Sequence, residues 1–226
     1  MKVLVACEES QTVCKAFRAR GHEAYSCDIQ LPSGGHPEWH ILGDAIAALR
    51  GGCVQTMDMV LHEVGRWDLA ICHPPCTYLS NAGACRMYRY INGRRWIDSD
   101  RYEKMDSGRA FFFKMFNANA ERIAVENPTP LKICKLPEPT QIIQPYEYGD
   151  PYSKRTLLWL VNLPELTPTE FCEKHETWIE SNTSGFARGK GGSRGVAKNA
   201  RERSKTFDGI ADAMADQWGS LERRAE

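Results

Sequence analysis

Residues 2–28 read KVLVACEESQTVCKAFRARGHEAYSCD, and this stretch determines the fold that we expect. The apolar run at residues 2–6 predicts a buried strand, and apolar side chains then recur at helical spacing until Gly21, a typical helix stop. A second short strand is predicted at residues 23–27 and ends at Asp28. The order strand, turn, helix, strand and acid is typical of the start of a Rossmann-like unit, in which the acid binds ribose hydroxyls.

The turn between this first strand and the helix departs from the usual pattern. Cys7, Glu8, Glu9 and Ser10 stand where glycines normally let the backbone approach a cofactor. We therefore expect a dinucleotide to fit poorly, whereas a cofactor without a pyrophosphate needs less of that close approach. The alternative for Asp28 is a local role in which its carboxylate only starts a turn.

The next segments continue the α/β pattern. Residues 41–44 predict a short third strand with Asp44 at its tip, and residues 45–49 and 57–64 have helical character. Each strand predicted so far is thus followed by a turn or a helix. This alternation indicates a mostly parallel sheet with one continuous core.

A cysteine follows the next strand directly. The apolar run at residues 67–71 ends at two prolines, and the residue after them is Cys76. Because prolines cannot donate to a sheet ladder and hold the backbone stiff, the thiol is restricted to the strand end. That position suits a nucleophile, although a structural cysteine is the commoner role. Since ligands of open α/β sheets bind at the carboxyl ends of strands, we expect Asp28, Asp44 and Cys76 to share one cleft.

Arginines and aromatic residues alternate between residues 86 and 109. This pattern predicts a polar loop that suits phosphates and unstacked bases, but four acids among these residues make a merely solvated loop equally acceptable. Residues 110–117 form a strongly apolar segment, which predicts a core helix.

A further strand at residues 122–125 ends at Glu126, the expected partner of Cys76. A carboxylate raises the pKa of a neighbouring thiol, so Glu126 is better suited to hold the substrate than to deprotonate the nucleophile. A late strand is predicted around residues 155–160, and Lys154 and Arg155 at its start can reach a phosphate.

Composition limits the class of protein. Hydrophobic residues make up 42% and charged residues 26% of the 226-residue chain, and the net charge is zero, as in ordinary globular proteins. The first residues are too short a run for a signal peptide, and nine cysteines without a CxxC pair indicate reduced thiols and no structural zinc. We therefore expect a cytoplasmic protein. Residues 185–205 predict a flexible basic segment, a phosphate-binding arm or a solvated linker, before a final helix at residues 208–218.

Taken together, these motifs resemble those of the cytosine 5-methyltransferases, most closely the compact members met in bacteriophage and prophage genomes. Residues 75–80, PCTYLS, are similar to the family's Pro-Cys-Gln-x-x-Ser loop, with Thr77 in place of glutamine. Residues 126–128, ENP, are similar to its Glu-Asn-Val motif. Residues 148–155 resemble its Tyr-Gly-x-Pro-Gln-x-Arg stretch, without the glutamine and one arginine.

The resemblance implies a Rossmann-like S-adenosylmethionine-dependent methyltransferase fold, with a mostly parallel sheet and helices on both faces. It implies a catalytic domain at residues 1–163, a short basic linker or reduced recognition segment at residues 164–203, and a C-terminal helix within residues 204–226 that packs back on the catalytic domain. A full target-recognition domain does not fit between residues 164 and 203. Specificity is then low, or a protein partner supplies it, or the substrate is smaller than duplex DNA.

The same resemblance implies the roles of the site residues. Cys76 would add to ring carbon 6 of cytosine in DNA, Glu126 would bind ring nitrogen 3 and the amino group, and Lys154 or Arg155 would hold the ring or its phosphate. S-adenosylmethionine would be held by Ala6, Cys7, Glu8, Ser10, Asp28, Ile29, Asp44, Ala45, His73 and Pro74.

Other functions stay open from the sequence. The substrate can instead be a cytosine nucleotide or a single strand, or the chain can be a catalytically altered nucleic-acid-binding protein on the same fold. Residues 73–76, HPPC, also resemble the Asp-Pro-Pro-Tyr motif of amino-group methyltransferases. A cytosine deaminase has the least support, because the zinc-binding PCxxC pattern is absent at Cys76.

Overall fold

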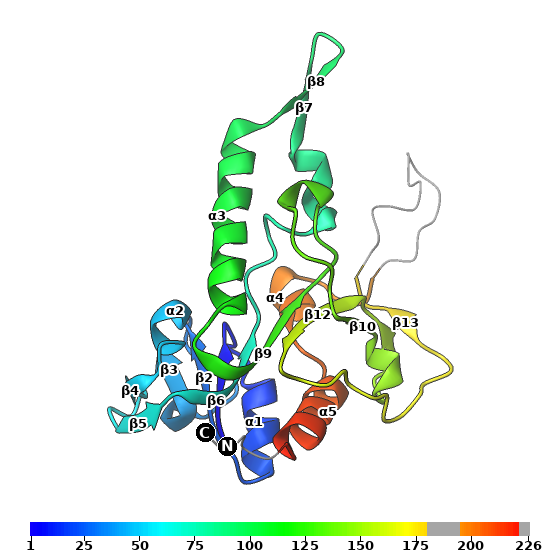
Figure 1. Cartoon of the computed structure of the whole chain (residues 1–226). Helices are drawn as coiled ribbons and strands as arrows, with labels where there is room; N and C mark the ends of the chain where they lie inside the picture. Colours follow the sequence, from blue (N-terminus) through cyan, green and yellow to red (C-terminus); the bar gives the residue numbers. More distant parts are fainter. Residues whose placement is uncertain (180–194, 222–226) are drawn as a thin grey trace.

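A seven-stranded sheet forms the centre of the computed structural model, which describes residues 1–179 and 195–221 (Figure 1). The strands lie in the order β10-β12-β9-β6-β1-β2-β3. Only β12 runs antiparallel to its neighbours. The bounds of the seven are β1 (Lys2–Ala6), β2 (Glu23–Asp28), β3 (His40–Leu42), β6 (Trp67–Cys72), β9 (Ala120–Asn127), β10 (Gln141–Ile143) and β12 (Thr156–Val161).

The strand order reverses between β1 and β6. The chain first builds β1, β2 and β3 toward one edge and then returns to place β6 and β9 on the other side of β1. This is the doubly wound order, with the antiparallel strand β12 inserted before the last position. In such folds ligands bind at the carboxyl ends of the strands where the order reverses, which here are β1 and β6. The α/β class and the mostly parallel sheet predicted from the sequence are confirmed.

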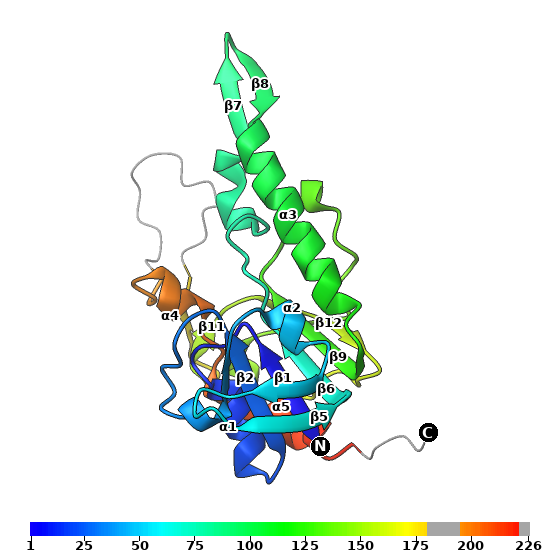
Figure 2. The same cartoon turned by 90° about the vertical axis from the view of Figure 1, so that its left-hand side faces the viewer.

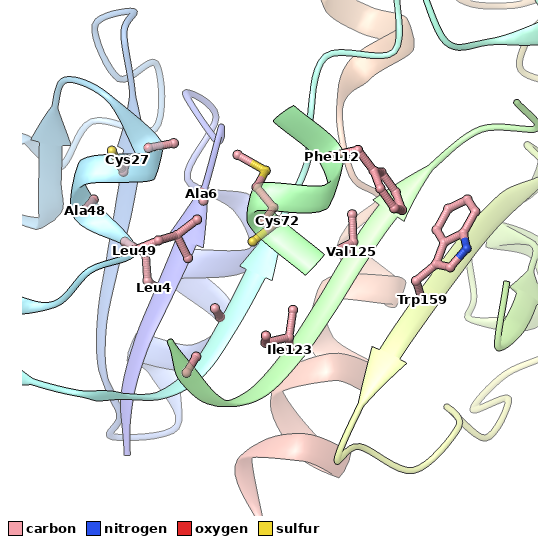
Figure 3. Close-up of a cluster of buried hydrophobic side chains, with 14 of the residues drawn as sticks. Leu4, Ala6, Cys27, Ala48, Leu49, Cys72, Phe112, Ile123, Val125 and Trp159 are labelled. Atoms are coloured by element: carbon pink, nitrogen blue, oxygen red, sulfur yellow. The ribbon is translucent and has the colours of Figure 1, made fainter. Parts of the chain in front are cut away.

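Helices cover both faces of the sheet. On one face lie α1 (Thr12–Ala19) and α5 (Asp208–Gly219), which contact each other and bury alternate strand residues such as Val3 and Leu69. On the other face lie α2 (Ala45–Ala48) and α3 (Ser99–Phe116). Figure 3 shows this second layer, where Leu4 and Cys72 face the same side of the sheet as Phe112 of α3.

The remaining elements are short. The strands are β4 (Gly52–Gln55), β5 (Leu61–Gly65), β7 (Tyr88–Ile91), β8 (Arg94–Ile97), β11 (Tyr152–Ser153) and β13 (Glu176–Thr177); the helices are α4 (Ala200–Ser204) and the 3-10 turns η1 (Pro37–Trp39), η2 (Asn81–Arg86), η3 (Lys132–Cys134) and η4 (Pro145–Glu147). No helix within residues 1–179 or 195–221 combines the length and apolarity needed to cross a membrane. All nine cysteines lie within these ranges and are free thiols.

The prediction of helical character at residues 57–64 is wrong, because these residues form the end of a turn and strand β5, paired with β4. The side chain of Thr56 donates to Asp58 (2.6 Å), and Met59 has a left-handed backbone with φ 68°, so the chain turns back on itself. Of the apolar residues here, Val64 is buried but Leu61 is exposed. The apolar residues at 57–64 therefore do not form the buried face of a helix.

The loop predicted between residues 86 and 109 is also wrong. Its first part is the β7–β8 hairpin, closed by Asn92 and Gly93 with φ of 51° and 75°, a favoured hairpin turn. Its second part is the N-terminal half of α3, which begins where the Asp98 side chain accepts from the Arg101 amide (2.9 Å). The core helix predicted at residues 110–117 is the C-terminal part of α3, with Phe112 fully buried.

Part of the basic segment predicted at residues 185–205 is a helix. Residues 185–194 lie outside the described residues. Beyond them, α4 begins at the Asn199 cap, whose side chain accepts from the amide of Glu202 (2.9 Å). The C-terminal helix α5 is held to α1 by ion pairs from Arg20 to Asp212 and Asp216.

Candidate active site at the carboxyl edge of the sheet

The Cys76 loop is held from both sides. His73 extends β6 by one hydrogen bond, from its amide to the Ala6 carbonyl (2.9 Å), before the two prolines end the ladder. The side-chain amide of Asn127 in β9 donates to the Pro74 carbonyl (3.0 Å). After the prolines, the Cys76 carbonyl accepts from the amide of Ser80 (2.8 Å). The thiol therefore stands on a short turn fixed to two strands.

Two other segments brace the far end of this loop. The Leu131 amide donates to the Leu79 carbonyl (2.7 Å), and the Leu79 side chain is fully buried. Arg101 of α3 donates to the Thr77 carbonyl (2.7 Å), and its guanidinium lies 4.4 Å from the centre of the Tyr78 ring. The sequence pattern gave no indication of this arginine clamp.

His73 and Glu126 lie side by side on adjacent strands. Cys72 pairs in register with Val125, so the next residues of β6 and β9 are neighbours. His73 Nδ1 is 3.2 Å from Glu126 Oε2, and their side chains are only 9% and 12% exposed. His73 Nε2 is buried and has no hydrogen-bond partner among the described residues. Such an atom is a position that a bound ligand can satisfy.

The environment of Glu126 favours its charged form. Burial raises the pKa of this carboxyl, but the hydrogen bond from His73 and the charges of Lys154 and His73 outweigh burial and hold the pKa below its usual value. Glu126 is therefore a carboxylate at neutral pH. As an acceptor between strands, it is available to a donor such as an amino group.

The environment of Cys76 has the opposite effect. Burial raises the pKa of the thiol, the negative charge of Glu126 raises it further, and the charge of Lys154 partly opposes both. The free protein thus holds Cys76 as a thiol, beside a carboxylate and an ammonium group. As expected from the sequence, Glu126 does not activate Cys76 by its charge.

Of the two predicted cations, the structure brings only Lys154 to Cys76. Lys154 precedes β12, and its Nζ donates to the Lys205 carbonyl (3.1 Å). Arg155 is exposed and lines a separate hollow of about 360 Å³ with Lys132 and Leu157, which does not include Cys76.

Glu8 fills the position where a pyrophosphate would approach. Its carboxylate accepts from the amides of Val13 (2.6 Å) and Cys14 (3.2 Å) at the start of α1, and the residue is 4% exposed. Burial is the main cause that raises the pKa of this carboxyl. Cys7, just before it, has a left-handed backbone with φ 61°. The chain's own acid therefore occupies the helix N-terminus that binds phosphates in dinucleotide-binding folds.

Asp28 and Asp44 are each used by their own turns. Asp28 Oδ1 accepts from the Gln30 amide (2.9 Å), and Asp44 Oδ1 accepts from the Ile46 amide (2.9 Å). The local role considered for Asp28 is therefore real. The same edge exposes Ile29, with 80% of its surface in solvent.

The other predicted cofactor residues differ in accessibility. Ala6, Ala45 and Pro74 are buried, so their side chains present little surface to a ligand. Ser10 lies at the start of α1, where its hydroxyl accepts from that of Thr12 (3.2 Å).

Comparison with protein-family models and with curated proteins finds no match to this chain. The geometry of the carboxyl edge and the motif resemblance therefore carry the functional argument. That edge brings together a thiol, an ionised carboxylate, an ammonium group and a half-satisfied imidazole, beside the reversal of strand order.

Proposed function

We propose that this protein transfers a methyl group from S-adenosylmethionine to carbon 5 of cytosine in DNA, through a covalent bond between Cys76 and ring carbon 6. We assign it on this basis to the compact cytosine 5-methyltransferases, and its sheet to the methyltransferase type of Rossmann-like fold. One observation carries the proposal: Cys76, Glu126 and Lys154 come from three separate segments and act on one another electrostatically at the carboxyl edge. The motif resemblance had named Cys76 and Glu126, together with Lys154 or Arg155.

The chemistry requires both the thiol and the carboxylate. Carbon 5 of cytosine is a weak nucleophile until Cys76 sulfur bonds to carbon 6, which moves electron density to carbon 5. Glu126 accepts from the exocyclic amino group and passes a proton to ring nitrogen 3 as negative charge develops there. The Cys76 thiol releases one proton as the sulfur–carbon bond forms, and this is the proton that Glu126 passes to ring nitrogen 3. Loss of the carbon 5 proton then breaks the sulfur–carbon bond and regenerates Cys76.

The other half of the edge fits a nucleoside cofactor without a pyrophosphate. When bound, S-adenosylmethionine would supply the electrophilic methyl group. In this proposal Asp28 would accept from its ribose hydroxyls, and the exposed Ile29 would cover one face of its adenine. Glu8 excludes a pyrophosphate but leaves a ligand of net positive charge unopposed. Nε2 of His73, which has no hydrogen-bond partner among the described residues, would be a further contact point.

The proposal is tested by incubating pure protein with labelled S-adenosylmethionine and duplex DNA. We expect 5-methylcytosine by nucleoside mass spectrometry, a loss of at least about 100-fold in Glu126→Gln, and no product from Cys76→Ser. Cys85→Ser is the matched control, because Cys85 is an exposed thiol close in sequence. Equal labelling by Cys76→Ser, or a product methylated on the amino nitrogen, would overturn the proposal.

A second readout traps the covalent step. DNA with fluorine at carbon 5 of cytosine has no proton to lose there after methyl transfer, so the bond to Cys76 cannot be broken by elimination. Wild type and Cys85→Ser are expected to form a stable protein–DNA adduct, and Cys76→Ser none. Mass mapping of the adduct to another residue would remove Cys76 from the mechanism.

A further inference from the structure

The β7–β8 hairpin projects beyond the carboxyl edge of the sheet, at the free end of α3 (Figure 2). Its large apolar side chains lie in solvent: Tyr90 is 73% and Trp96 is 55% exposed, and Ile91 and Ile97 are also exposed. Residues 88–97 contain three arginines and no acid. Arg89 pairs with Asp98 at the base of the hairpin, and Arg94 and Arg95 next to the turn give a neutral protein a local positive charge on one exposed ribbon.

The register distributes this character over both faces of the ribbon. Directly paired residues of an antiparallel ribbon share a face, and successive pairs alternate between faces. The pairs on one face are Tyr88 with Ile97 and Tyr90 with Arg95; those on the other are Arg89 with Trp96 and Ile91 with Arg94. Each face therefore presents arginine together with an aromatic side chain.

The mixed character of both faces indicates which kind of partner the hairpin contacts. A ribbon that packs on a protein surface typically has one apolar face and one polar face. A ribbon inside a groove has a wall on each side, and the walls of a nucleic-acid groove carry phosphates along their rims. The major groove of duplex DNA, about 12 Å wide, admits a two-stranded ribbon.

We propose that the β7–β8 hairpin inserts into a groove of duplex DNA, with Arg94 and Arg95 at the phosphates and Tyr90 and Trp96 against sugars and base edges. The inference rests on the proposed function and adds to it the element that grips the substrate. The hairpin performs part of the work for which residues 164–203 are too short.

Hydrogen bonds connect the base of the hairpin, through the start of α3, to the Cys76 loop. At its base the Asp98 amide donates to the Met87 carbonyl (3.0 Å), and the Asp98 carboxylate pairs with Arg89 and caps α3. One turn further, Arg101 donates to the Thr77 carbonyl beside Cys76. A duplex held by the hairpin is therefore positioned relative to the thiol.

Equilibrium binding by the full chain tests the proposal. Fluorescence anisotropy with a labelled 20-base-pair duplex is measured at several salt concentrations without S-adenosylmethionine. We expect Arg94→Gln/Arg95→Gln to weaken binding about tenfold or more, and to reduce the slope of log K against log salt by about 1.8, since each phosphate contact contributes about 0.9. Tyr90→Ala/Trp96→Ala is expected to weaken binding with the slope unchanged.

Controls separate charge loss from unfolding. Arg50→Gln/Lys114→Gln removes two exposed cations at the C-terminal ends of α2 and α3 and is expected to bind like wild type. Thermal melting should be the same for all variants, because the changed side chains are exposed. Wild-type affinity in both hairpin variants would overturn the proposal. So would hairpin variants that change only in oligomeric state, or a wild-type protein that binds the single strand more tightly than the duplex.

The outcomes also separate this proposal from the proposed function. Hairpin variants that methylate and bind duplex normally would refute the hairpin and leave Cys76 chemistry intact. If wild type never methylates DNA but Cys76→Ser still binds duplex through the hairpin, the proposed function would be refuted and the hairpin proposal would stand.

Discussion

The two halves of the carboxyl edge use their polar side chains differently. In the β1–β3 half, Glu8, Asp28 and Asp44 accept from backbone amides a few residues further along the chain. In the β6–β9 half, His73 contacts Glu126 across strands, and Lys154 reaches both Glu126 and Cys76 electrostatically. The first half stabilises its own turns, whereas the second concentrates charge at one point.

The β1–β3 half therefore acts as a scaffold, and the β6–β9 half contains the proposed reaction centre. A carboxylate satisfied by its own turn presents a fixed acceptor to a ligand without cost in stability. The buried His73 imidazole, with one nitrogen that has no hydrogen-bond partner among the described residues, is a position that a ligand can complete. The following four experiments test this division, in order of decreasing effect.

Removing Glu8 should cost the most stability. Glu8→Ala leaves the buried amides of Val13 and Cys14 without an acceptor, so we expect a loss of about 3–4 kcal/mol in the free energy of unfolding. Glu8→Gln keeps one acceptor oxygen and should lose less. Urea unfolding measures both, with Glu63→Ala as an exposed control expected within about 0.5 kcal/mol. A loss in Glu8→Ala no larger than in the control would show that the turn does not need its acid.

Removing His73 should cost somewhat less and depend on pH. His73→Leu strips Glu126 of its hydrogen-bond donor, so the pKa of Glu126 rises and about 2–3 kcal/mol is lost at pH 7. In wild type the lowered pKa contributes stability above the unfolded value, which is lost only as pH falls through the folded value. In the variant, protonation relieves the buried charge as pH falls.

The gap between wild type and His73→Leu should therefore shrink from pH 7 to pH 5. His73→Asn retains a donor near the position of Nδ1 and should recover part of the loss. Urea unfolding at both pH values is the measurement. A gap that stays constant or widens toward pH 5 would contradict the pairing of His73 with Glu126.

Asp28 tests whether the scaffold half also binds a ligand. S-adenosylmethionine at a hundred times its Kd should stabilise wild type by about 2.7 kcal/mol in thermal melting. If Asp28→Ala weakens binding tenfold, the same concentration gives about 1.4 kcal/mol. Glu63→Ala should retain the full shift. No shift in wild type would argue against the cofactor, and a full shift in Asp28→Ala would limit Asp28 to its turn.

The smallest effect concerns the reactivity of Cys76. Because Glu126 raises and Lys154 lowers the pKa of this thiol, alkylation at pH 8 should be about 3–10-fold faster in Glu126→Gln and slower in Lys154→Met. Iodoacetamide labelling resolved by peptide mass spectrometry gives the rate, with exposed Cys85 as an internal reference. Changes of the same sign in both variants would show that the two charges do not meet at Cys76.

The sequence predicted local elements well where the residues of a single strand or helix determine the periodic pattern. The apolar stripe of α1 and the strand preceding Cys76 are examples, since each buries side chains at a fixed period. The pattern failed for residues 57–64, where Met59, Val60 and Leu61 are exposed, and for the hairpin, where the Asn92–Gly93 signal lay inside a basic, aromatic stretch.

The sequence by itself determined the α/β class, the position of Cys76 at a strand end and the acids at the strand tips, because these follow from local periodicity and from proline chemistry. Only the tertiary structure decided that His73 touches Glu126, that Lys154 rather than Arg155 approaches the thiol, and that Arg101 clamps the Cys76 loop. Such contacts depend on strand register and on packing between distant segments. The spacing of residues along one chain does not specify either of them.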